Sequence, residues 1–143
     1  MAERTQEVWE LEIRAAAAEL VRVDDFAARL FTLVYPEEAD LLAFVLREAV
    51  LNAVEANEEA ADNKLKISVA SEQEGLVILV LDPGKGFVAG WHDKLEKASM
   101  EENLFEERGR GLLFIKDMVD EIWSEWEPEN GHVFGMRKKW RGV

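Results

Sequence analysis

The 143-residue sequence contains no cysteine, and its 17 lysine and arginine residues are outnumbered by 30 aspartate and glutamate residues. Without cysteine the chain forms neither disulfides nor thiolate zinc sites, which is compatible with a reducing compartment. The net charge of −13 argues against nucleic acid as a partner, because neutralising phosphates requires a basic surface. No apolar run approaches the roughly 20 residues of a membrane span, and the acidic N-terminus does not resemble a signal peptide. We therefore expect a cytoplasmic protein that contacts no membrane.

Hydrophobic residues make up 48% of the chain and charged residues 33%, a balance typical of a globular protein. The length suits one domain, residues 1–143, with a single core. Apolar periodicity and turn residues locate the elements. They predict strands over 8–14, 65–70 and 76–81, helices over 15–33, 37–56 and 112–122, and a hairpin with arms 123–126 and 132–140.

The helix over 37–56 carries the first candidate site. Glu48, Asn52 and Glu55 follow one another at i, i+4 and i+7 and therefore share one side of the helix. A carboxylate can orient a nucleophile, and an amide oxygen is a good Mg²⁺ ligand. Taken alone, these residues are better explained as the solvent-exposed side of an amphipathic helix. Its apolar side carries Leu42, Leu46, Ala49, Val50 and Ala53.

The second candidate site follows the apolar strand over 76–81. Asp82 ends this strand, and an acid there can accept a hydrogen bond from an exocyclic amine such as that of adenine. Gly84 and Gly86 allow the backbone to approach a flat ligand. The alternative is a plain Asp-Pro-Gly turn that only ends the strand.

The third candidate site is the segment Gly109, Arg110, Gly111 and Leu112, which we expect to open the helix over 112–122. Glycine backbone leading into a helix N-terminus binds phosphate oxygens well, because the first N–H groups are free and the helix dipole is positive there. A flexible hinge before a helix is the alternative.

The order and spacing of the three sites resemble the N, G1 and G2 boxes of the GHKL, or histidine kinase-like, ATPase superfamily. The resemblance covers about residues 8–140, and the small size together with the sequence around Glu48 and Asn52 looks most like the anti-sigma-factor serine/threonine kinases of bacterial partner-switching systems. It implies an α/β (α+β) two-layer sandwich of the Bergerat type, with helices on one face of a mixed sheet, that binds ATP and Mg²⁺.

The same resemblance implies roles for individual residues. Glu48 would be the general base or orienting carboxylate for an attacking hydroxyl, Asn52 would ligate Mg²⁺, and Asp82 would recognise the adenine amino group. Gly84 and Gly86 would shape the adenine and ribose pocket, Gly109, Arg110, Gly111 and Leu112 would wrap the triphosphate, and residues 87–108 would form the ATP lid.

The partners implied are an anti-anti-sigma (antagonist) protein that receives the phosphoryl group and a sigma factor or similar client. A homodimer is a further possibility, for which the edge-strand residues Trp9, Leu11 and Ile13 offer a face. Two alternatives stay open: an ATP-responsive protein-binding module with little transfer activity, and a fold that has lost its nucleotide.

The sequence departs from the family pattern after the first site. Many relatives have a histidine and a glycine where this chain has Ala56 and Asn57, so a donor near the phosphates is missing. The two histidines, His92 and His132, fall in the expected lid and hairpin, where we expect surface residues rather than phospho-acceptors.

Overall fold

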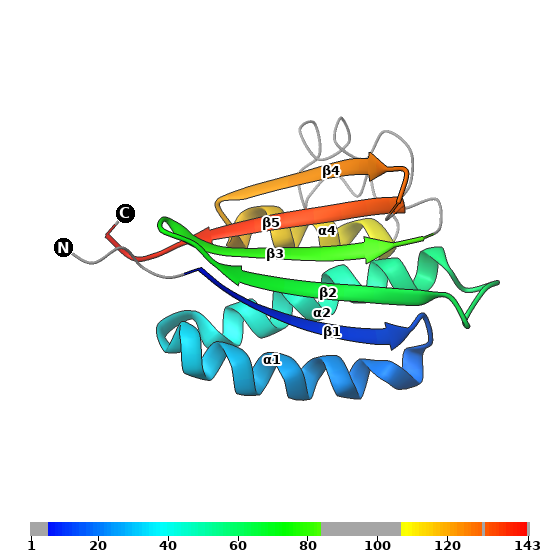
Figure 1. The fold of residues 1–143 in the computed structure, drawn as a ribbon, viewed down its shortest axis with the longest axis horizontal. Coiled ribbons are helices and arrows are strands. Elements are labelled where there is room, and N and C mark those ends of the chain that lie inside the picture. The colour runs from blue at the N-terminus through cyan, green and yellow to red at the C-terminus, as the bar shows by residue number, and fades with distance from the viewer. Residues whose placement is uncertain (1–5, 84–106, 130, 143) are drawn as a thin grey trace.

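The computed structural model describes residues 6–83, 107–129 and 131–142. These residues form one five-stranded sheet in the order β1-β2-β3-β5-β4, with helices lying against one of its faces (Figure 1). The strands are β1 (Glu7–Arg14), β2 (Lys64–Ser71), β3 (Gly75–Asp82), β4 (Glu121–Glu127) and β5 (Gly131–Lys139). The helices are α1 (Leu20–Val34), α2 (Ala39–Ala56) and α4 (Glu107–Met118), with 3₁₀ turns η1 (Ala17–Glu19) and η2 (Pro36–Glu38).

The predicted two-layer α/β sandwich is confirmed, but the sheet is not mixed. Every pairing between the described strands is antiparallel. β3 and β4 do run in the same direction, with α4 between them in the chain. After β4 the chain reverses direction in a hairpin, and β5 lies between β3 and β4. β5 therefore pairs antiparallel with both strands.

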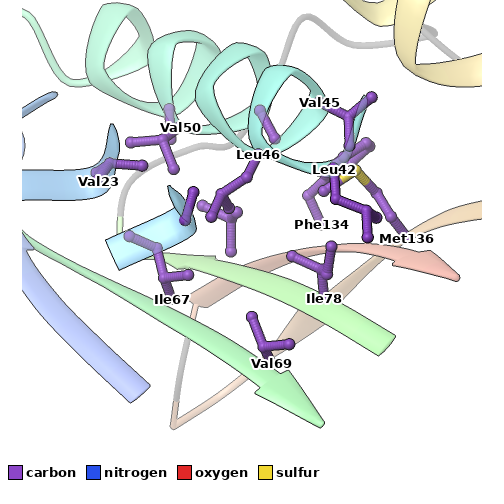
Figure 2. Packing of buried hydrophobic residues seen from close by; sticks show 14 of the residues in the cluster. Val23, Leu42, Val45, Leu46, Val50, Ile67, Val69, Ile78, Phe134 and Met136 are labelled. Carbon is purple, nitrogen blue, oxygen red and sulfur yellow. The ribbon is translucent and has the colours of Figure 1, made fainter. Parts of the chain in front are cut away.

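The core lies between α2 and the sheet, and Figure 2 shows apolar side chains from both layers meeting there. α2 contributes one side because its apolar residues recur at helical spacing. The strands contribute alternate residues, because successive side chains point to opposite faces. Fully buried examples are Leu42, Leu46 and Val50 from α2 and Ile67, Ile78 and Phe134 from β2, β3 and β5. β3 is the central strand, as its continuous apolar run predicted.

α4 begins at Glu107, earlier than the sequence predicted, and ends at Met118. The glycines at 109 and 111 therefore lie inside the helix and do not precede it. A glycine within a helix costs about 1 kcal/mol relative to alanine, and burial of Leu112 and Ile115 in the core offsets that cost. No helix in the described part of the chain is long and apolar enough to cross a membrane.

The end of the sheet remote from Asp82 is tied to the helical layer by Tyr35. Its hydroxyl donates to the carbonyl of Lys139 over 2.9 Å, and its ring packs against Trp140 with centroids 4.9 Å apart. Trp140 in turn donates its indole N–H to the carbonyl of Glu72 over 2.9 Å. These contacts hold β5 in place at one end, while the polar residues described below gather at the other.

Candidate functional site

Glu48 and Asn52 lie one turn apart on α2, on the side that packs against α4. The facing residue of α4 is Gly111. A Cβ atom built on Gly111 would lie 2.7 Å from Glu48 Oε2 and 3.6 Å from Asn52 Nδ2. The structure therefore brings the first and third candidate sites together, and the absence of a side chain at residue 111 leaves room for the Glu48 carboxylate.

The amide of Asn52 is the unsatisfied group of this cluster. Its Nδ2 atom is buried and forms no hydrogen bond among the described residues. A buried polar atom without a partner is costly, so a ligand that engages this amide would be favoured. Rotation of the amide presents Oδ1 in the same place, and that atom suits a hard cation.

The donor set fits magnesium bound together with phosphate. Mg²⁺ commonly takes one or two protein ligands and completes its octahedron with phosphate oxygens and water. Within residues 6–83, 107–129 and 131–142, no group of three or more His, Asp or Glu side chains could hold a metal alone. Asn52, with Glu48 beside it, can therefore hold a cation if the remaining ligands come from a bound molecule and from water.

A second polar cluster forms where β3 ends. Asp82 is 1% exposed, and its Oδ1 accepts a hydrogen bond of 2.8 Å from Asn57 Nδ2. The same nitrogen donates to the carbonyl of Ala53 in the last turn of α2, also over 2.8 Å. Asn57 Oδ1 accepts from Asn63 Nδ2 over 2.9 Å. The acid at the end of β3 is thus fixed to the end of α2.

Asn57 is a residue that sequence reasoning missed. In the sequence it stands out only as a departure from the family pattern, yet the residue is 4% exposed and its side chain takes part in three hydrogen bonds. An asparagine directly after a helix often hydrogen-bonds the last helical carbonyls. This tendency could have predicted the contact of Asn57 with Ala53. Nothing in the sequence pointed to its contact with Asp82.

His132 lies opposite Asp82 in the pairing of β3 with β5. It is 6% exposed, and its Nε2 lies 2.7 Å from Ser124 Oγ, a hydrogen bond within the β4–β5 hairpin. Burial lowers the pKa of His132, and the Asp82 carboxylate partly opposes that shift. The prediction of a surface histidine is therefore wrong here. Strand alternation, which places His132 on the same face as the core residue Phe134, was the signal.

The remaining predicted site residues are only partly described. Gly109 and Arg110 belong to the first turn of α4, so they form no loop ahead of it. Leu112 is 5% exposed and packs in the core, and it lies beyond the first turn of α4, where the free N–H groups of a helix are found. Gly84, Gly86 and the predicted lid lie outside the described residues, except that the last two lid residues belong to α4.

The two polar clusters are linked by α2. Asn52 and Asn57 are five residues apart, which corresponds to about 7.5 Å along the helix axis. One cluster offers a carboxylate and an amide beside bare glycine backbone, and the other offers a buried acid at a strand end. A helical layer over one face of an antiparallel sheet, with two polar clusters along its central helix, defines the class of the protein as a two-layer α/β domain.

A family model described as the histidine kinase-like ATPase domain matches residues 13–138, so the chain belongs to this family. The match covers almost the whole chain, from the end of β1 to the end of β5. It confirms the superfamily predicted from the three motifs, and ATP binding is the function that membership implies. No curated protein matches the sequence.

Proposed function

We propose that the protein binds Mg-ATP and transfers the γ-phosphoryl group to a serine or threonine of a partner protein, as an anti-sigma factor or similar partner-switching regulator. The observation that supports this most strongly is the contact of Gly111 with Glu48 and Asn52. It sets a carboxylate and an unsatisfied amide beside a helix position that has no side chain. Phosphoryl transfer depends on such positioning and charge stabilisation more than on covalent chemistry by the protein.

The proposal assigns a role to each of three residues. Asp82 would accept a hydrogen bond from the exocyclic amine of adenine, and Asn52 would hold Mg²⁺, which would supply positive charge to the phosphates. Glu48 orients the attacking hydroxyl and accepts its proton. The hydroxyl oxygen then forms a bond to the γ-phosphorus, the bond from that phosphorus to the β–γ bridging oxygen breaks, and ADP leaves with that electron pair.

The partners we propose are an antagonist (anti-anti-sigma) protein as the phosphoryl acceptor and a sigma factor or another client that is sequestered. A homodimer is also proposed, through the β1 edge of the sheet. The half-buried side chains of Trp9 and Leu11 lie along that strand beside α1. The net charge of −13 supports protein partners over nucleic acid.

The test is phosphoryl transfer from labelled ATP to antagonist proteins encoded by neighbouring genes. We expect stoichiometric transfer by the native chain, and loss of transfer with retained ATP binding in Glu48→Gln. Asp40→Asn is the matched control, because it removes the same charge from an exposed position of α2. Equal transfer by Glu48→Gln and the control would remove Glu48 from the mechanism.

An ATP-responsive binding module with little transfer activity is the second candidate, and one observation favours it. Ala56 has no polar side chain where many relatives carry a histidine, and the amide of the next residue, Asn57, is occupied by Asp82 and Ala53. Nothing at these two positions donates to a phosphate. Tight Mg-ATP binding together with nucleotide-dependent partner binding, and no transfer to any antagonist, would favour the module over the kinase.

A further inference from the structure

We propose that Asn57 is a positioning residue that sets the base selectivity of the nucleotide site by orienting the Asp82 carboxylate. The inference rests on the proposed binding of ATP and adds a residue to it. Neither the family membership nor the three motifs assign a role to Asn57. The geometry does so, because Asn57 joins the end of α2 to the acid at the end of β3.

The orientation of the Asn57 amide is fixed from both of its ends. Its nitrogen faces two acceptors, Asp82 Oδ1 and the carbonyl oxygen of Ala53, each at 2.8 Å. Its oxygen faces a donor, Asn63 Nδ2, at 2.9 Å. Turning the amide over would set oxygen against two oxygens and nitrogen against nitrogen. The amide therefore presents its N–H donor, and not its oxygen, to Asp82.

This donor decides how Asp82 meets a purine base. An ionised carboxylate has only acceptors, and each of its oxygens can accept two hydrogen bonds, so engagement by Asn57 leaves capacity for a ligand. Because Asn57 engages Oδ1, it restricts the rotation of the carboxylate and so the directions from which its oxygens can accept. An adenine amine donates to that group, whereas the carbonyl oxygen at the same position of hypoxanthine or guanine would face another acceptor.

The experiment compares the affinities for Mg-ATP and Mg-ITP, which differ at the exocyclic position. We expect the native chain to prefer ATP by roughly tenfold or more. In Asn57→Asp two carboxylates meet at hydrogen-bond distance, and they must share a proton or move apart. Either outcome removes the fixed acceptor, so we expect the ATP-to-ITP preference to fall by about fivefold or more.

A charge-matched swap, Asn57→Asp with Asp82→Asn, tests the orientation itself. The introduced carboxylate accepts from the nitrogen of the introduced amide, which turns the amide oxygen toward the base and restores the preference for ATP. The contact with Ala53 is lost, so overall stability falls while the preference returns. This variant keeps the net charge and side-chain volumes of the native chain. If Asn57→Asp does not fold, the ATP-to-ITP preference is measured with the swap alone.

Tyr35→Phe is the control for simple destabilisation, since it removes one part-buried hydrogen bond at the opposite end of the sheet. We expect it to lower the melting temperature without changing the ATP-to-ITP preference. Equal weakening of both nucleotides in Asn57→Asp and in the swap would overturn the positioning role. Failure of the native chain to bind ATP would instead overturn the proposed function, so the two failures are distinguishable.

Discussion

Replacing Gly111 by alanine should separate the stability of α4 from the chemistry of the site. Gly111 lies within the helix, and alanine favours a helix over glycine by about 1 kcal/mol. The added methyl group would lie 2.7 Å from Glu48 Oε2, closer than a van der Waals contact. Because that atom is the end of a flexible, half-buried side chain, it can move at little cost. We expect the melting temperature of the free protein to stay constant or rise by roughly 3 °C.

The same methyl group should damage nucleotide binding and transfer. It occupies the space beside Asn52 and displaces the Glu48 carboxylate from its native position. A ligand at a hundredfold its dissociation constant stabilises a protein by about 2.7 kcal/mol. We expect Gly111→Ala to lose most of that stabilisation by Mg-ATP, and transfer to fall by about 100-fold, since misplacement of a catalytic group by about 1 Å has effects of that size.

Thermal unfolding with and without Mg-ATP, together with the transfer assay, measures both effects. Asp117→Ala is the matched control, because it also raises helix propensity in α4 but does so at an exposed position. It should leave the stabilisation by Mg-ATP unchanged. If Gly111→Ala bound Mg-ATP and transferred phosphate as well as this control, the contact between α2 and α4 would have no part in the site.

Two further predictions concern the fold. Phe134→Ala removes a fully buried ring from β5 and should lower the free energy of unfolding by about 3–5 kcal/mol, measured by urea denaturation. His132 has a folded-state pKa below its unfolded value, so the unfolded chain takes up its proton first as the pH falls. Stability from this group is complete above the unfolded pKa of about 6.5 and declines as the pH falls below it, by at most about 1.4 kcal/mol per pH unit. The free energy of unfolding, measured between about pH 7.5 and about pH 5.5, should show this decline in the native chain and in His92→Gln but not in His132→Gln. An equal dependence on pH in all three chains would contradict the role of His132.

Local periodicity predicted most of the fold. The alternating residues of β1 and the apolar run of β3 are short-range patterns, and both strands lie within a residue or two of their predicted bounds. The antiparallel sheet was not predictable in the same way. The position of β5 between β3 and β4 depends on contacts between distant segments, which no local pattern records.

The start of α4 was misplaced for a different reason. Taken alone, the glycines at 109 and 111 predict that no helix has yet begun, because glycine disfavours a helix. In the folded chain, Leu112 and Ile115 anchor that helix in the core, and packing outweighs the local preference. The glycine at 111 is then explained by the Glu48 carboxylate facing it on α2.

Sequence reasoning could predict those residues of the candidate site whose side chains have an evident chemical role. Glu48, Asn52 and Asp82 were identified because carboxylates and amides at those places suggest a ligand. Strand alternation could have shown the burial of His132, but the contacts of Asn57 and His132 with Asp82 join segments far apart in the sequence. Their contacts place two further polar residues around Asp82, and only the three-dimensional structure could reveal them.

The most direct measurement of the central claim is calorimetric titration of the native chain with ATP, in the presence of magnesium and again in the presence of a chelator. We predict saturable heat corresponding to one nucleotide per chain, with markedly tighter binding when magnesium is present. The absence of any heat with Mg-ATP would contradict the assignment of Glu48, Asn52, Asp82 and Gly111 to a nucleotide site.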